Sequence, residues 1–265
     1  MVSVPSGQTY RCYYKSRSTL ALCIQKTTAQ HGTSFGLYRQ AIIHNNSPAP
    51  TTTFEGKVVI VVGASSGLGL EACRSIIDLG ALQVILTCRN VEKGKAAANE
   101  IRSTTSCLPD TLQVWELDLS SYSSVQAFSD RVNTQLSRVD AVIANAGVHT
   151  GKFRMTADNE ESITTNVVSM SLLAFLVLPK LRGTAMKYNT QTHFTVTGSE
   201  LYEVAKFKES QVPLGQIFAT LNNESKANMG DRYNVSKLLA MFVVREIAIK
   251  SPLSSGVIVN CVAPG

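Results

Sequence analysis

Tyr233 and Lys237 lie four residues apart in Tyr-Asn-Val-Ser-Lys, and a glycine-rich stretch, Val-Gly-Ala-Ser-Ser-Gly-Leu-Gly, occupies residues 62–69 far upstream. At i, i+4 spacing on a helix, the phenol and the ammonium share one face. A neighbouring cation favours the phenolate and pulls the pKa of a phenol, about 10, toward neutrality. A tyrosine tuned in this way can give a proton to a carbonyl oxygen or take one from an alcohol.

The upstream glycines follow an apolar run and precede a helical pattern. Glycine at such positions permits a tight turn and close approach of the backbone to a pyrophosphate at the helix N-terminus. An ordinary glycine-rich turn is the alternative. Together with the Tyr–Lys pair, the stretch predicts a nicotinamide-dependent oxidoreductase. The residues of this stretch expected to bind the cofactor are Gly63, Ser65, Ser66, Gly67, Leu68 and Gly69.

The end of the second expected strand bears on the choice of dinucleotide. An NAD site usually has an Asp or Glu there for the ribose 2′-hydroxyl. This chain has Arg89 after Cys88, and no carboxylate before Glu92. Because a guanidinium can bind a 2′-phosphate, NADP is favoured over NAD. A solvated surface arginine is the alternative.

Two further strand ends carry candidate cofactor contacts. Asp118, followed by Leu119, ends the third strand, where it either reaches an adenine or caps the next turn. Asn145, Ala146 and Gly147 end the fourth strand, at the carboxyl edge where open α/β sheets bind ligands. A plain strand-to-loop turn is the alternative for this second segment.

A second pair, Tyr202 and Lys206, has the same spacing as Tyr233 and Lys237. It begins just after Ser199 and leads into a charged, interrupted stretch, whereas Tyr233 opens a run of good helix formers. We therefore prefer Tyr233 as the functional tyrosine, with a half-buried helix tyrosine as the alternative. The residues expected to anchor this helix to the core are Leu238, Leu239, Phe242 and Val243.

The order of elements predicts an α/β fold, a Rossmann-like doubly wound parallel sheet with helices on both faces. From Lys57 onward, short β-branched runs alternate with longer helical patterns. The crossovers are long enough to be helical, so right-handed connections are expected. The expected strands are residues 58–62, 83–88, 112–117, 141–144, 193–197 and 257–261, and the expected helices are 70–79, 91–102, 123–135, 157–181 and 231–250.

The net charge of +6 is concentrated near the N-terminus, because residues 1–54 contain five basic residues and no acidic ones. Residues 1–53 are predicted to be a poorly ordered basic segment, with a mitochondrial transit peptide as the alternative. Residues 54–265 form the expected Rossmann-fold domain. Since that domain is nearly neutral, no nucleic-acid partner is expected.

No apolar run reaches the roughly 18 residues that a membrane span needs, so no transmembrane segment is expected. The six cysteines are far apart, and their spacing indicates neither a metal site nor a disulfide framework. We expect a cytoplasmic protein, with a mitochondrial location as the alternative.

From about residue 54 to residue 265, these motifs together resemble the short-chain dehydrogenase/reductase family. Its glycine motif and Asn-Ala-Gly segment match, and its active-site tetrad maps onto Asn166, Ser199, Tyr233 and Lys237. Its Asn-x-Val-x-Pro-Gly segment matches residues 260–265, which implies cofactor contacts from Pro264 and Gly265. Arg89 is similar to the NADP-preferring, retinol-dehydrogenase-like branch, which includes fungal members.

The resemblance implies hydride transfer between NADP(H) and a carbonyl or alcohol on a small, fairly apolar substrate. Ser199 would hydrogen-bond the substrate oxygen, although a solvent-facing loop serine is the alternative. Tyr233 would supply the proton, and Lys237 would lower the pKa of Tyr233 and hold the nicotinamide ribose. Asn166 would position a water that links Lys237 to solvent. A homodimer through the helices after the fourth and fifth strands is also implied.

The chain departs from the family pattern in two ways. Ser199 and Tyr233 are 34 residues apart, which implies an inserted loop containing residues 207–229, the insertion segment, that lines or covers the substrate pocket. The chain stops where family members continue through a substrate-binding loop, a helix and a final strand, so the last strand is expected to be missing. These departures leave a catalytically silent dinucleotide-binding protein, or a nonfunctional truncated product, as the alternatives.

Overall fold

The computed structural model describes residues 10–12, 24–26 and 52–264. Its centre is a fully parallel six-stranded sheet in the order β10-β9-β6-β3-β4-β5. The predicted doubly wound α/β fold is confirmed, with strand bounds within one residue of those expected. The strands are β3 (Val58–Val62), β4 (Gln83–Cys88), β5 (Leu112–Glu116), β6 (Ala141–Ala144), β9 (Thr192–Thr197) and β10 (Val257–Val262).

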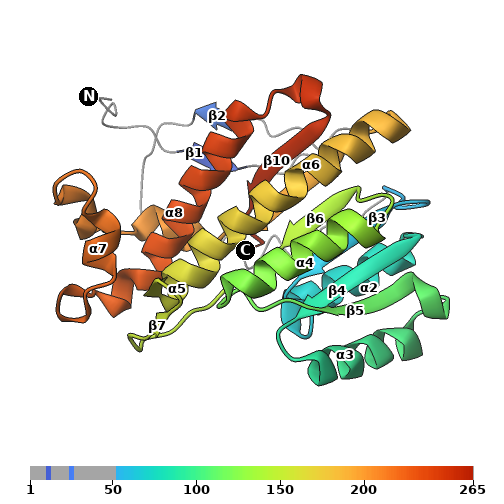
Figure 1. Cartoon of the computed structure of the whole chain (residues 1–265), viewed down its shortest axis with the longest axis horizontal. Coiled ribbons are helices and arrows are strands. Elements are labelled where there is room, and N and C mark those ends of the chain that lie inside the picture. The colour runs from blue at the N-terminus through green and yellow to red at the C-terminus, as the bar shows by residue number, and fades with distance from the viewer. Residues whose placement is uncertain (1–9, 13–23, 27–51, 265) are drawn as a thin grey trace.

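Helices cover both faces of the sheet (Figure 1). Adjacent strand residues point to opposite faces, so Ile60 of β3 packs in one core cluster and Val61 in the other. Helices α2 (Gly67–Asp78) and α3 (Val91–Thr104) cover the Val61 face. The Ile60 face is covered by α4 (Tyr122–Gln135), α6 (Met170–Tyr188) and α8 (Met229–Lys250).

The strand order reverses at β3, which pairs with β4 on one side and β6 on the other. Val62, the last residue of β3, is in register with Thr87 and Ala144. In open parallel sheets a crevice for ligands lies at such a switch point, beyond the carboxyl ends of the strands. The glycine turn directly follows β3, and the Asn-Ala-Gly segment directly follows β6.

The helix expected over residues 157–181 begins later and ends later than predicted. Residues 155–160 instead form a small antiparallel hairpin of β7 (Met155–Thr156) and β8 (Asn159–Glu160), which turns at Ala157 with φ of 49°. The helical stretch then runs through α5 (Glu161–Ile163) and a π-helical turn (Thr164–Ser169) into α6. It stops at Asn189, which adopts the left-handed conformation that ends many helices.

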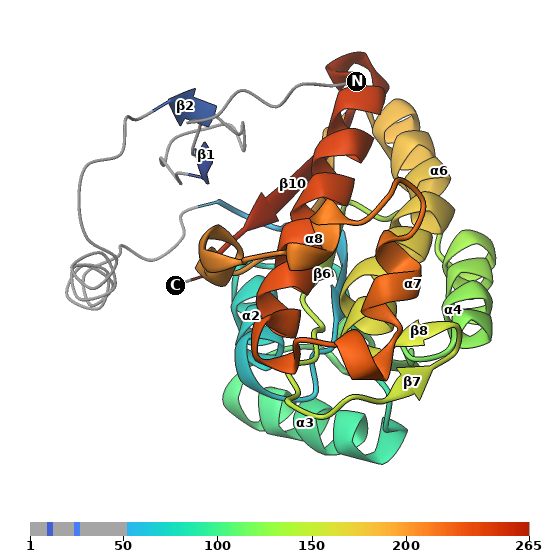
Figure 2. The same cartoon turned by 90° about the vertical axis from the view of Figure 1, so that its left-hand side faces the viewer.

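The insertion segment contains two short 3-10 turns and helix α7 (Ile217–Leu221). Helix α7 packs next to β8, and Figure 2 shows it alongside the β7–β8 hairpin and α8. The expected loop is therefore largely structured. It connects the 3-10 turn that follows Ser199 to helix α8, which carries Tyr233 and Lys237.

In the N-terminal part, β1 (Tyr10–Cys12) pairs antiparallel with β2 (Ile24–Lys26). The predictions of a poorly ordered segment or a transit peptide otherwise fall outside the described residues. Within the described part, the stretch Glu161–Tyr188 is long and apolar enough to cross a membrane, but 67% of its most apolar window is buried inside the protein. It packs as a core helix of the domain.

Candidate active site

Tyr233 and Lys237 lie one turn apart near the start of α8, as their spacing predicts. The Nζ atom of Lys237 is 5.6 Å from the centroid of the Tyr233 ring. Lys237 is buried, and Nζ donates a 2.7 Å hydrogen bond to the carbonyl oxygen of Thr197 at the end of β9. The helix is anchored mainly by Val235, Ala240, Val244 and Ile247; Phe242, expected to be an anchor, is 42% exposed.

Burial lowers the pKa of the Lys237 ammonium, and interaction with the Cys261 thiol raises it in part. A desolvated cation acts more strongly on a neighbouring phenol than one in bulk water, because the local dielectric is lower. The lowered pKa also makes the Lys237 proton easier to release. Both properties suit a group that helps a tyrosine exchange protons.

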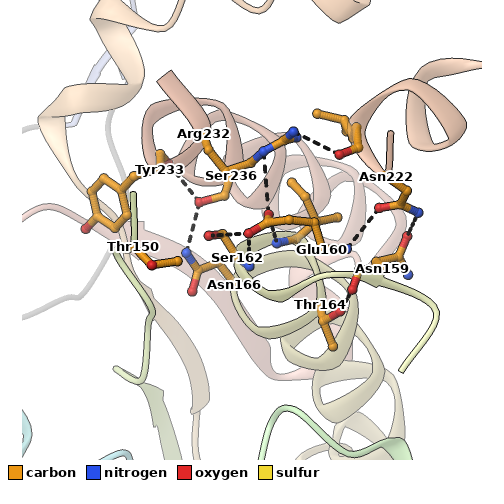
Figure 3. A network of polar contacts seen from close by, with 12 residues as sticks. Thr150, Asn159, Glu160, Ser162, Thr164, Asn166, Asn222, Arg232, Tyr233 and Ser236 are labelled. Atoms are coloured by element: carbon orange, nitrogen blue, oxygen red, sulfur yellow. Dashed lines mark hydrogen bonds and ion pairs between the residues drawn. The ribbon is translucent and has the colours of Figure 1, made fainter. Parts of the chain in front are cut away.

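Asn166 connects the loop after β6 to helix α8. Its Oδ1 accepts the N–H of Val148 at 2.8 Å, and its Nδ2 donates to the Val148 carbonyl and to Ser236 Oγ, both at 2.9 Å. Ser236 Oγ donates in turn to the Tyr233 carbonyl at 2.7 Å, as Figure 3 shows. With both amide hydrogens used by protein oxygens, the Asn166 side chain cannot also donate to a water. It sits in the π-helical turn, a feature frequent at functional sites.

Ser199 lies two residues after the end of β9 and is half-buried. Its Oγ accepts the N–H of Leu201 at 3.3 Å and so caps the 3-10 turn Glu200–Val204. A hydroxyl that accepts such a bond can still donate one, so capping and substrate binding are compatible. A cavity of about 40 Å³ lies beside Ser199, with Tyr202 and Cys261 in its wall.

The alternative pair, Tyr202 and Lys206, does not share a helix face. Tyr202 lies in the 3-10 turn, which ends at Val204, and its hydroxyl donates to Glu203 at 3.4 Å. Lys206 lies beyond that turn. The geometry of i, i+4 neighbours is therefore present at Tyr233 and missing at Tyr202.

The glycine turn has the conformation that its residues predict. Gly63 and Gly67 have φ of 73° and 60°, a region that favours glycine. A Cβ on Gly69 would lie 2.5 Å from the Gly63 carbonyl oxygen, so a side chain does not fit. Ser66, at the N-cap of α2, makes no side-chain cap. The first N–H groups of α2 thus remain for an anion, which fits a pyrophosphate.

Asn145 and Gly147 join this turn to the tetrad. Asn145 Nδ2 donates to the Gly63 carbonyl at 3.1 Å, and its Oδ1 accepts Thr197 Oγ1 at 3.4 Å. A Cβ placed on Gly147 would lie 3.4 Å from both Asn166 Oδ1 and Lys237 Nζ. Ala146 packs against Gly63, since a Cβ added to Gly63 would lie 2.6 Å from the Cβ of Ala146. The two groups of motifs therefore meet at the carboxyl ends of β3, β6 and β9.

The remaining candidates are arranged as follows. Arg89 is exposed after β4, and none of the ion pairs among the described residues involves it.

Asp118 accepts hydrogen bonds from Ser120 N at 2.9 Å and Ser120 Oγ at 2.7 Å, which is the capping role. The Leu119 side chain is buried in the core, which leaves its main chain to meet a ligand. Pro264 is exposed, and Gly265 lies outside the described residues.

Motif reasoning missed two features next to Tyr233. The His149 ring stacks on the Tyr233 ring, with centroids 4.4 Å apart. Arg232 is fully buried and pairs with Glu160. His149 and Glu160 are both distant in sequence from Tyr233. A charged residue such as Arg232 at the start of a helix is usually solvated. The one available signal for Arg232 was its position directly before the tyrosine.

The comparisons with known proteins agree with this geometry. A family model described as short chain dehydrogenase matches residues 57–192. The short chain dehydrogenase/reductase dmxR8 of Cryptosporiopsis sp. is 44% identical over 232 residues, which are 86% of this chain and 71% of the relative. The short chain dehydrogenase atnD of Emericella nidulans is 35% identical over 222 residues, covering 82% and 69%.

Solved structures show the same fold. A crystal structure of a metagenomic short-chain oxidoreductase in complex with NADP is 25% identical, with a TM-score of 0.59 over 81% of this chain and 84% of that one. The Pseudomonas aeruginosa RhlG/NADP complex has a TM-score of 0.61 at 21% identity, over 80% and 73%. The chain belongs to the short-chain dehydrogenase/reductase family, whose members are oxidoreductases that act on CH–OH or carbonyl groups of small molecules. The resemblance in its motifs is confirmed.

Proposed function

We propose that this chain is an NADP(H)-dependent oxidoreductase that interconverts a carbonyl and an alcohol on a small, fairly apolar substrate, with Tyr233 as the acid–base group. The proposal rests on one observation. Asn145 and Gly147 place the glycine turn, which fits a pyrophosphate, beside Lys237, which shares a helix face with Tyr233. The tetrad and the phosphate-binding turn are thereby parts of one site.

The preference for NADP is supported by Arg89. Its exposed guanidinium directly follows Cys88, the last residue of β4, at the position from which a 2′-phosphate would be bound. A bidentate Arg–phosphate contact is both strong and specific. Two structurally similar proteins, the metagenomic oxidoreductase and RhlG, were solved in complex with NADP, which is consistent with this preference.

In the reductive direction, a bound NADPH would supply a hydride to the carbonyl carbon. Tyr233 donates its phenolic proton to the carbonyl oxygen, and the C=O double bond becomes a C–OH single bond. Ser199 donates a hydrogen bond to that oxygen while charge develops on it. The Lys237 ammonium stabilises the phenolate that remains on Tyr233, and the reverse sequence oxidises an alcohol.

Deuterium transfer tests this reaction class. The protein is incubated with NADPH deuterated at the nicotinamide C4, with each diastereomer in turn, and with a panel of apolar aldehydes and ketones. One diastereomer should place deuterium on the carbinol carbon of a product alcohol, detected by mass spectrometry. NADPH binding without any transfer across the panel would favour the catalytically silent alternative, and no binding at all would defeat the proposal.

Assembly and location remain predictions. A homodimer through α6 and α8 is supported by the exposed side chains of Phe175 on α6 and Phe242 and Ile249 on α8. Sedimentation equilibrium at several protein concentrations would measure it, with a monomer mass throughout as the contradicting result. A cytoplasmic location also remains a prediction, and imaging of the tagged protein would test it.

A further inference from the structure

A buried ion pair lies directly beside the tetrad. The side chains of Glu160 and Arg232 are both fully buried, and Arg232 Nε is 3.5 Å from Glu160 Oε2. Arg232 precedes Tyr233 on α8, and Glu160 is the N-cap of the helical stretch that carries Asn166. Figure 3 shows the pair between these two helical segments. Two members of the tetrad are thus connected by opposite charges that water does not reach.

Each charge also holds a backbone segment. The Glu160 carboxylate accepts the N–H groups of Ser162 at 3.1 Å and Ile163 at 3.4 Å. Arg232 Nη2 donates to the Leu221 carbonyl at 2.8 Å, at the end of α7. Within the described part of the chain, Nε and Nη1 of Arg232 make no hydrogen bond, so the attraction of Glu160 is their principal compensation.

The insertion segment is attached at both ends by residues next to Tyr233. Near its start, the Asp231 carboxylate accepts the N–H groups of Lys206 at 2.9 Å and Phe207 at 3.3 Å. Toward its end, Arg232 holds Leu221, and Asn222 Oδ1 accepts the N–H of Glu160 at 2.9 Å. The placement of the segment and the placement of the tyrosine therefore depend on the same turn of α8.

We propose that Glu160 and Arg232 are a positioning pair, which fixes Tyr233 relative to Asn166 and holds the insertion segment against the catalytic helix. Desolvation makes a buried ion pair a poor source of stability, and apolar residues of similar volume often serve as well. Its directional bonds instead define where the joined segments lie. A displacement of about 1 Å at a catalytic group can cost roughly 100-fold in rate, so such a pair has kinetic consequences.

The kinetic test rests on the proposed function and compares Arg232→Met and Arg232→Lys with the control Arg138→Met. Arg138 pairs with buried Asp140 at 2.7 Å, before β6 at the opposite end of the sheet from the tetrad. Arg232→Met should lower kcat for a ketone that the wild type reduces by at least about tenfold, with NADPH affinity within about twofold and partial recovery in Arg232→Lys. If Arg138→Met and Arg232→Met lose the same amount of Tm and also the same fraction of kcat, the pair does not act by positioning Tyr233.

A second measurement does not depend on activity. Phe218 in α7 is 44% exposed, and chymotrypsin cleavage after it reports how firmly the insertion segment is held. Arg232→Met and Asn222→Ala should speed this cleavage at least about fivefold relative to wild type and Arg138→Met. Unchanged cleavage in both would overturn the attachment. If Arg232→Met does not fold, Asn222→Ala replaces it in both the kinetic test and the proteolysis test. A wild-type protein that binds no NADPH would defeat the proposed function, and proteolysis would still decide this inference.

Discussion

The imidazole ring of His149 stacks on the phenol ring of Tyr233, with centroids 4.4 Å apart and 24° between the ring planes. His149 follows Val148, whose backbone is held by Asn166 on both its N–H and its carbonyl. The loop after β6 therefore covers one face of the tyrosine ring. The stack confines the ring on that face.

Removal of this stack should affect turnover. An aromatic pair contributes about 0.5–1.5 kcal/mol beyond the area it buries, so His149→Ala should lower kcat by roughly two- to tenfold. His149→Phe preserves the stacking surface and should stay within about twofold of wild type. Steady-state kinetics on both variants measure the difference. Full activity in His149→Ala would show that the stack does not position Tyr233.

Lys237→Met should remove activity and stabilise the fold near neutral pH. Burial lowers the pKa of Lys237 below its ordinary value of 10.5, so the folded state binds this proton less tightly than the unfolded state. The free energy of unfolding therefore rises with pH from the folded-state pKa up to 10.5, where the penalty disappears. We expect Lys237→Met to have a higher free energy of unfolding than wild type at pH 7, with the difference shrinking as pH rises. Thermal unfolding across pH measures it, and a lower Tm for Lys237→Met at pH 7 would contradict it.

Arg89→Ala should weaken NADPH selectively. Loss of a charge-assisted contact to a 2′-phosphate costs about 1.5–3 kcal/mol, or roughly 10- to 150-fold in affinity. NADH, which lacks that phosphate, should bind Arg89→Ala and wild type alike. Fluorescence titration with both dinucleotides provides the comparison. Equal losses for NADPH and NADH, or no loss for either, would assign Arg89 to the solvated surface.

Gly69→Ala should abolish dinucleotide binding, because its Cβ would lie 2.5 Å from the Gly63 carbonyl oxygen and 2.8 Å from Asn145 Nδ2. Gly183→Ala is a matched control, since a Cβ at that exposed position of α6 meets nothing within 4 Å. The control should be neutral or stabilising by up to about 1 kcal/mol. Isothermal titration and thermal unfolding of both variants test this. Normal NADPH affinity in Gly69→Ala would refute the assigned geometry of the turn.

Most of the fold followed from local patterns. Strands such as β3 and β4 are buried runs of β-branched and aliphatic residues between turns, so their bounds could be read closely. The structure of the stretch before α6 could not be read from the sequence in this way. Its polar residues 157–160 are compatible with a helix, and the hairpin depends on the positive φ at Ala157. Tertiary contact decided that conformation, including the bond between Glu160 N and Asn222.

The site divides in the same way. Motif spacing located Tyr233, Lys237 and the glycine turn, because their roles require fixed local geometry. It did not predict that Arg232 is buried or that His149 covers Tyr233, since both features arise only when segments distant in sequence pack together. Asn166 was located as a tetrad member, but its bonds to Val148 and Ser236 depend on the folded chain.

The central claim is that Tyr233 exchanges the proton at a site that also binds NADPH. The most direct measurement is NADPH-dependent reduction by Tyr233→Phe, beside Tyr202→Phe as the control. Tyr233→Phe should lose at least about 100-fold in kcat and bind NADPH within about threefold of wild type, while Tyr202→Phe stays within about twofold of wild type in kcat. Turnover by Tyr233→Phe at close to the wild-type rate would contradict the account.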